Sequence, residues 1–367
     1  TAKNIIDASD AQKNTRIGTN AGNSFDGTNA NNNTLIGYDA GTAITGADDN
    51  TFVGSAAGDA VTTGQENTFV GRHAGGGTNT GRSNVAMGYE TFVANTTGNY
   101  NTALGYEALR ANTTANYNTA VGQGALRANT TGENNSAVGR NSLTLNTTGA
   151  NNDAFGAYAL DANTTGSFNN AFGRSALSSN TTGSQNTALG YGALFDATTA
   201  NDNVAVGNWA LENNTTGSKN VGVGNSALGA TTTGGNNTAV GYQALTASTT
   251  GGANIAVGSE ALEASTTADY NVAIGYQAMH VSTTAYKNVS IGAYSLDALT
   301  TGNSNICIGH EAGTDLTTGS NSVCIGVKAG ANITTADYNV AIGQEALETN
   351  TTGASNVAIG FRALEAN

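Results

Sequence analysis

The sequence lacks proline and has little charge: of 367 residues none is proline, two are cysteine, one is tryptophan, and 11% are charged. Hydrophobic residues make up 38%, many of them alanine, which leaves little material for a thick core. No apolar run approaches the roughly 20 residues of a membrane span. The 13 lysines and arginines are scattered within a net charge of −13. Because nucleic acids and anionic membranes require clustered positive charge, we expect neither as a partner. The overall composition of the sequence is also not that of a typical enzyme.

What the sequence does contain is a periodic glycine. The Gly of an "NTAVG"-like pentad occurs 21 times, from Gly18 through Gly37 to Gly360, and every step after Gly37 is 17 residues. Only the first step is longer, by two residues. A period kept this strictly allows no insertions, so each unit should stack in register on the previous one. We predict a non-repeat segment over 1–13 and one continuous solenoid over 14–367, with no internal domain boundary.

The repeat unit reads N-T-A-V-G-Y-x-A-L-x-A-N-T-T-G-x-x, numbered here as positions 1 to 17. Position 2 is mostly Thr, Val or Ile and position 4 is apolar in every copy, an alternation that predicts a strand. We expect positions 2 and 4 to face the core, a face that becomes more apolar after residue 255, with position 3 and the Gly opposite. For residues such as 105–112 a second strand and a helical turn both remain open, and we favour a strand. The closing "TTG" predicts a turn.

These patterns predict an all-β fold, a parallel β-solenoid (β-roll or β-helix) of 21 coils. Asn fills position 1 in 20 of 21 copies, which predicts an amide ladder between coils. The Gly of position 5 should supply either a positive φ or room for another backbone. The residues selected for the Asn ladder are Asn101, Asn118, Asn135, Asn152, Asn169 and Asn186, and those for the structural Gly are Gly105, Gly122, Gly139 and Gly156.

A single coil of this kind offers only two or three sizeable apolar side chains, against a conformational cost of about 1–2 kcal/mol per residue. A lone thin solenoid is therefore poorly supported, and close packing of several chains is expected.

The pentads "NTAVG" (118–122) and "NVAIG" (271–275, 339–343 and 356–360), with the neighbouring "YQAL" (242–245) and "TTG" (249–251), resemble the repeats of bacterial and phage tail-fibre-domain proteins. They are more distantly similar to the head repeats of trimeric autotransporter adhesins. The resemblance implies a left-handed homotrimer, located extracellularly, on a cell surface or on a virion. It also leads us to expect a tip, cap or chaperone outside this sequence, which begins without Met and stops in mid-repeat at "ALEAN".

Few residues suggest chemistry, and we predict no catalytic residue, no metal and no cofactor. The histidines, His73, His280 and His310, fall at different repeat positions without a carboxylate or Cys at metal-ligand spacing, so they should be surface residues. Cys307 and Cys324 lie one period apart at position 3, which permits a disulfide, although two small apolar residues replacing Ala is the favoured interpretation. The Asn-Thr-Thr segments from Asn95 to Asn180 match the N-glycosylation pattern but need only be turns.

Exposed aromatics offer the remaining binding hypothesis. Tyr106, Tyr242, Tyr276 and the single Trp209 are candidates for a surface on which carbohydrate stacks, although packing between chains accounts for the tyrosines equally well. The leading functional hypothesis is the shaft of an extracellular or virion fibre or adhesin, with further copies of itself and a cell-surface glycan or protein receptor as partners. The alternatives are an ice- or carbohydrate-binding solenoid and a self-assembling extracellular filament. A polysaccharide-degrading enzyme is disfavoured, because no repeat is broken by a cluster of carboxylates.

Overall fold

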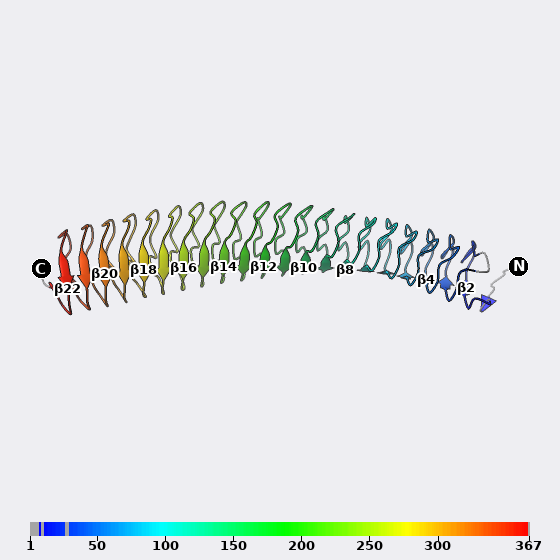
Figure 1. The fold of residues 1–367 in the computed structure, drawn as a ribbon, viewed down its shortest axis with the longest axis horizontal. Coiled ribbons are helices and arrows are strands. Elements are labelled where there is room, and N and C mark those ends of the chain that lie inside the picture. The colour runs from blue at the N-terminus through cyan, green and yellow to red at the C-terminus, as the bar shows by residue number, and fades with distance from the viewer. Residues whose placement is uncertain (1–6, 9–10, 26–28, 366–367) are drawn as a thin grey trace. The chain divides into compact units, whose positions relative to one another are not determined.

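A computed structural model describes residues 7–8, 11–25 and 29–365. The chain forms two compact units that divide between Ser184 and Gln185. Within the described ranges every regular element is a β-strand and no residue is helical. Each coil of the repeat contributes one short strand, and successive coils of a unit lie one on the next (Figure 1).

The first unit contains β1 to β11. Their bounds are β1 Asp7–Ala8, β2 Thr15–Ile17, β3 Thr34–Ile36, β4 Thr51–Val53, β5 Thr68–Val70, β6 Val85–Met87, β7 Thr102–Leu104, β8 Thr119–Val121, β9 Ser136–Val138, β10 Asp153–Phe155 and β11 Asn170–Phe172. The second unit contains β12 to β22. Their bounds are β12 Thr187–Leu189, β13 Val204–Val206, β14 Val221–Val223, β15 Thr238–Val240, β16 Ile255–Val257, β17 Val272–Ile274, β18 Val289–Ile291, β19 Ile306–Ile308, β20 Val323–Ile325, β21 Val340–Ile342 and β22 Val357–Ile359.

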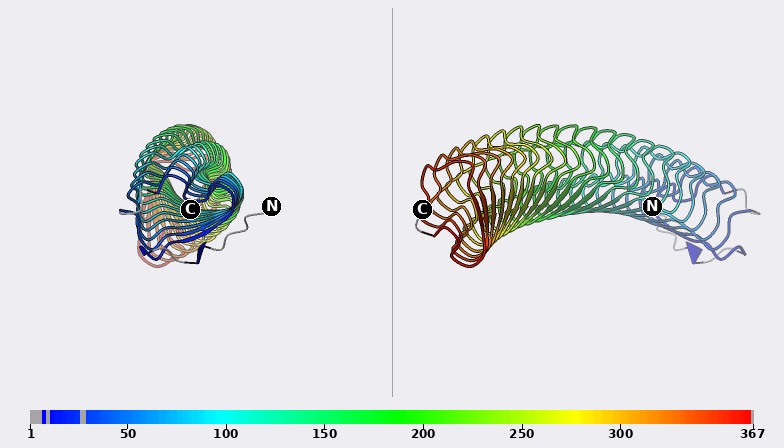
Figure 2. Two further views of the ribbon diagram at one scale, coloured as in Figure 1. Left: turned by 90° about the vertical axis from the view of Figure 1, so that its right-hand side faces the viewer. Right: turned by 60° about the vertical axis from the view of Figure 1, so that its left-hand side comes forward.

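The strands of each unit pair in parallel and in register. Thr102 of β7 faces Thr119 of β8, and Leu104 faces Val121, so that equivalent positions of the repeat lie side by side. The exception is β1, which pairs antiparallel with β2. The all-β parallel solenoid with a 17-residue repeat, predicted from the glycine period, is thereby confirmed, and Figure 2 shows each coil closing a single loop.

The strand is oriented opposite to our expectation. Ala103, at position 3, is completely buried, whereas Thr102 and Leu104, at positions 2 and 4, are partly exposed. The interior of a 17-residue coil is narrow, and Ala103, Ala108 and Leu109 already occupy it. The prediction that positions 2 and 4 form the core is therefore wrong. The β-branched residues that accumulate after residue 255 increase the apolar character of the outer face, not of the core.

The segment after the strand is neither a strand nor a helical turn. Residues 106–111 form consecutive turns in which Glu107 (φ 54°) and Leu109 (φ 51°) have left-handed backbones. The amide of Glu107 donates to Tyr89 O of the preceding coil at 3.0 Å, and that of Leu109 donates to Ala125 O of the following coil at 3.0 Å. The second strand that we favoured is wrong, because alternate left-handed residues break the pleat of a strand and the hydrogen-bond sequence of a helix.

In most coils the larger core side chain stands at either position 3 or position 9. Most coils have Ala at position 3 and Leu at position 9, as in Ala103 and Leu109. Where position 9 is Gly, position 3 is larger: Phe52 accompanies Gly58 and Cys324 accompanies Gly330. A Cβ at Gly58 would lie 2.5 Å from the Phe52 ring, so a single coil has room for only one of the two large side chains.

Candidate functional site

The Asn residues of position 1 form a ladder inside the solenoid. The backbone amide of Asn118 donates to Asn101 Oδ1 at 3.0 Å, and that of Asn135 donates to Asn118 Oδ1 at 2.9 Å. The Asn118 Nδ2 group donates to Gly132 O, three positions before the next Asn, at 3.0 Å. The same contacts join Asn152 and Asn169, and in the second unit Asn203 donates to Asn186 Oδ1 at 3.1 Å. The amides are buried and act on neighbouring coils, so they are structural groups and not a ligand site.

A second amide ladder, which the sequence reasoning missed, runs along position 12. Asn112 Nδ2 donates to Asn95 Oδ1 at 3.0 Å, and Asn129 Nδ2 donates to Asn112 Oδ1 at 3.1 Å. These are the residues that match the glycosylation pattern. They are completely buried, so the folded chain offers no access to a glycan at Asn95, Asn112, Asn129, Asn146, Asn163 and Asn180. The recurrence of Asn at a second fixed position was the available signal.

The position 5 glycines satisfy both roles that the sequence left open. Gly105 and Gly122 have φ values of 134° and 133°. A Cβ at Gly122 would lie 2.5 Å from Gly139 O of the next coil, and one at Gly156 would lie 2.5 Å from Gly173 O. Each Gly therefore ends its strand with a backbone that other residues rarely adopt, at a point where two coils approach closely.

In the second unit the outer strand face carries two parallel rows of side chains, which are apolar except for Thr187 and Thr238. In the second unit none of the residues at positions 2 and 4 of the eleven strands is charged. Ile255, Ile274 and Ile306 expose 41%, 37% and 40% of their surface. In the first unit the Phe155 and Phe172 rings stack on this face with centroids 4.9 Å apart. A continuous apolar sheet face of this kind is typical of a protein–protein contact.

The candidate aromatic residues do not form one platform. Tyr106 stacks on Tyr89 with centroids 5.5 Å apart, and Tyr276 meets the Tyr294 ring edge-on at 5.4 Å. Trp209 is only partly exposed. Its ring lies against Tyr191 and Phe195 of the preceding coil, over the space that a Cβ on Gly192 would occupy. Tyr242 is exposed and has no ring contact among the described residues. These aromatics cover neighbouring coils in several separate places.

Cys307 and Cys324 are adjacent, completely buried and free. They face inward at position 3, and a Cβ on Gly313 or Gly330 would lie 2.8 or 2.7 Å from their respective sulfur atoms. Each Cys therefore fills part of the volume that Leu occupies in other coils. A hydrogen bond to Cys324, together with burial, raises the pKa of the Cys307 thiol well above its ordinary value. At neutral pH Cys307 is thus a protonated packing residue and not a nucleophile.

His280 has carboxylate neighbours that the spacing within its own repeat did not indicate. Its Nε2 lies 2.6 Å from Glu263 Oε2, and its Nδ1 lies 3.8 Å from Asp297 Oδ1. Both partners are one 17-residue period away, a spacing that is remote in sequence but adjacent in a solenoid. Searching one period on either side of each histidine would have found them.

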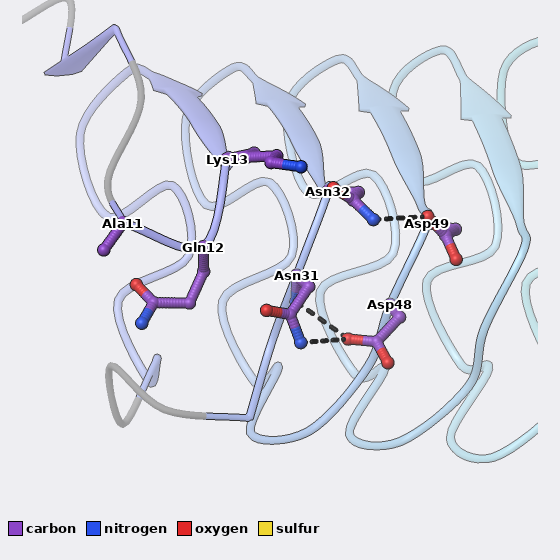
Figure 3. Close-up of a pocket in the computed structure, with 7 residues that line it drawn as sticks. All are labelled: Ala11, Gln12, Lys13, Asn31, Asn32, Asp48 and Asp49. Atoms are coloured by element: carbon purple, nitrogen blue, oxygen red, sulfur yellow. Dashed lines mark hydrogen bonds between the residues drawn. The ribbon is translucent and has the colours of Figure 1, made fainter.

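Two of the hollows on the described surface are polar. One of about 360 Å³, beside β2 to β4, is lined by Ala11, Gln12, Lys13, Asn31, Asn32, Asp48 and Asp49. Asn31 Nδ2 donates to Asp48 Oδ1 at 3.1 Å and Asn32 Nδ2 donates to Asp49 Oδ1 at 3.0 Å (Figure 3). These side chains of the hollow therefore already pair with one another between coils. A typical ligand pocket, by contrast, is concave and mostly apolar.

Comparison of the chain with protein-family models and with curated proteins gives no match. The resemblance to tail-fibre and adhesin repeats therefore stays a prediction. In the part of the chain that the structure describes, no helix has the length and apolar character needed to cross a membrane.

Proposed function

We propose that the chain is the structural shaft of an extracellular or virion fibre, in which copies of the chain pack side by side through their outer strand faces. The observation that carries this proposal is the uncharged, apolar outer face of the second unit, in β12 to β22. The buried Asn ladders of positions 1 and 12 keep the coils regularly stacked. The apolar residues of positions 2 and 4, which would form the core of a compact protein, lie on the outer face.

The size of this face supports other copies of the chain as its occupant. If each side chain at positions 2 and 4 exposes roughly 50 Å², eleven coils present roughly 1,000 Å², compared with the about 800 Å² that each partner contributes to a standard interface. A second copy has the same 17-residue period, so its rows match these rows along their whole length. Three copies and a left-handed winding are the arrangement that the sequence resemblance implies, and a closed cyclic trimer satisfies the rows of every chain.

The test is the mass of the native particle by light scattering. We expect about 110 kDa, from three chains of 36.6 kDa. The double variant Ile274→Lys and Ile306→Lys places two charges on the outer face and should reduce the mass to that of one chain. The control, Tyr270→Lys and Tyr338→Lys, alters two residues that are more exposed but lie at position 17, and it should leave the mass unchanged.

A monodisperse 36.6 kDa wild-type particle would contradict the proposal. So would an unchanged mass for the Ile274 and Ile306 variant, provided that circular dichroism shows it folded. A mass that falls equally in the control would place the contact elsewhere and would also reject this face.

The outward threonines of the first unit favour ice binding as a second candidate. Thr102 and Thr119 lie in register on adjacent strands and are partly exposed. The threonines of the turn are less suitable for binding ice, since Thr113 Oγ1 already donates to Thr130 O at 3.0 Å. Thermal hysteresis that disappears in Thr102→Lys and Thr119→Lys would support this candidate, and wild-type protein without hysteresis would exclude it.

A further inference from the structure

Position 10 of three successive coils in the second unit carries Glu263, His280 and Asp297. The stacking places the imidazole between two carboxylates, with Nε2 2.6 Å from Glu263 Oε2 and Nδ1 3.8 Å from Asp297 Oδ1. The three side chains are about one third exposed, so they are accessible from solvent and yet held by the coil. An imidazole in this position can bind a metal ion through one nitrogen and donate a hydrogen bond from the other to a carboxylate that orients the ring.

Glu260, at position 7, adds a further carboxylate to the cluster. One ligand atom from each of Glu260, Glu263 and His280 lies within 4.8 Å of the others. A tetrahedral zinc ion with bonds of about 2.1 Å holds its ligand atoms about 3.4 Å apart. Small side-chain rotations therefore suffice to bring all three onto one ion. Gln277 Nε2 donates to Glu260 Oε2 at 2.6 Å and orients that carboxylate.

The cluster differs in its charge balance from the carboxylates that pair with a Lys or Arg. Arg127 pairs with Glu107, Lys328 with Glu311, and Arg362 with Glu345. Among the described residues no Lys or Arg forms an ion pair with the three carboxylates of this cluster. Negative charge is thus concentrated around a single titratable imidazole.

Asp297 provides an independent indication. Its Oδ1 is buried and receives no hydrogen bond, although the side chain as a whole is about one third exposed. When the Nε2 of a histidine binds a metal, its Nδ1 carries the proton and normally donates it to a carboxylate or carbonyl. Asp297 Oδ1, which faces Nδ1, is the acceptor that this arrangement requires.

We propose that Glu260, Glu263 and His280 Nε2 bind a zinc-like divalent cation, with Asp297 accepting a hydrogen bond from His280 Nδ1. Imidazole with carboxylates suits zinc, whereas calcium and magnesium prefer oxygen ligands alone. Three protein ligands leave a fourth position for water. The ion joins the coils of β16 and β17 and so stabilises their stacking. The second acidic cluster, Glu345, Glu348 and Glu365, has Arg362 as its cation and is not included.

The experiment is zinc titration of the metal-free full chain by calorimetry, with melting temperature as a second readout. We expect one zinc ion per chain and a higher melting temperature with zinc. His280→Gln should abolish both effects, and Asp297→Asn should weaken binding by about 10–100-fold. His310→Gln and Glu348→Gln, at other surface positions, should bind as the wild type does, and calcium should not bind at the same site.

One further variant tests whether the cysteines, and not the proposed cluster, bind the zinc. Cys307→Ala with Cys324→Ala introduces the residue found in most other coils and should retain zinc binding. The proposal is overturned if zinc does not bind the wild type, if the cysteine variant loses binding, or if folded His280→Gln binds with unchanged affinity. Circular dichroism establishes that each variant is folded before it is titrated.

Discussion

At the scale of residues, the coil divides a fixed interior volume between positions 3 and 9. Phe52→Ala should cost about 3–5 kcal/mol because it leaves a cavity, and Gly58→Leu should cost at least about 1–3 kcal/mol because its Cβ lies 2.5 Å from the Phe52 ring. Together the two changes recreate the pair formed by Ala103 and Leu109. We expect the double variant to be more stable than either single variant, measured by urea unfolding. Additive costs would show that the two sites do not share volume.

At the scale of elements, the turn after each strand depends on position 5 more than on position 7. A Cβ on Gly122 meets the backbone oxygen of Gly139 at 2.5 Å, whereas one on Gly124 meets only the side-chain Oδ1 of Asn141. Position 7 is left-handed but accepts other residues, as Glu107 shows. Gly122→Ala should therefore cost more than about 3 kcal/mol and Gly124→Ala about 1–2 kcal/mol. Thermal unfolding compares them, and equal losses would contradict this account.

The elements also show how far the sequence could predict the structure. The alternation at positions 2 and 4 predicted the strands, and the 17-residue glycine period predicted their register, because a period without insertions stacks equivalent positions on one another. It could not specify which strand face is buried, since both Thr102 with Leu104 and Ala103 with Leu109 form plausible apolar sets. A left-handed Leu109 has no sequence signal, because leucine rarely adopts that backbone. The environment of His280 was missed because its partners lie one full period away.

At the scale of the whole molecule, half-buried carboxylates in an acidic chain determine how stability varies with pH. Burial raises the pKa of Asp59, Asp161 and Asp297 above 3.8, the ordinary value for Asp. A carboxyl whose pKa is higher in the folded state binds protons more tightly there, so its stabilising contribution is complete below 3.8 and is lost as pH rises through the folded value. The net charge of −13 adds self-repulsion at neutral pH.

We therefore expect the melting temperature to increase as pH is lowered from about 7 toward about 4.5.

Asp161→Asn should raise the melting temperature at neutral pH and flatten its pH dependence, because the amide removes the cost of a half-buried charge. Its oxygen can still accept the hydrogen bond that Ser178 Oγ donates to Asp161 Oδ1 at 2.6 Å. The control is Asp202→Asn, at an exposed position, which should leave the slope unchanged. A wild-type melting temperature that is highest at neutral pH would contradict this prediction, since it would mean that carboxylates stabilised by folding outnumber those that burial disfavours.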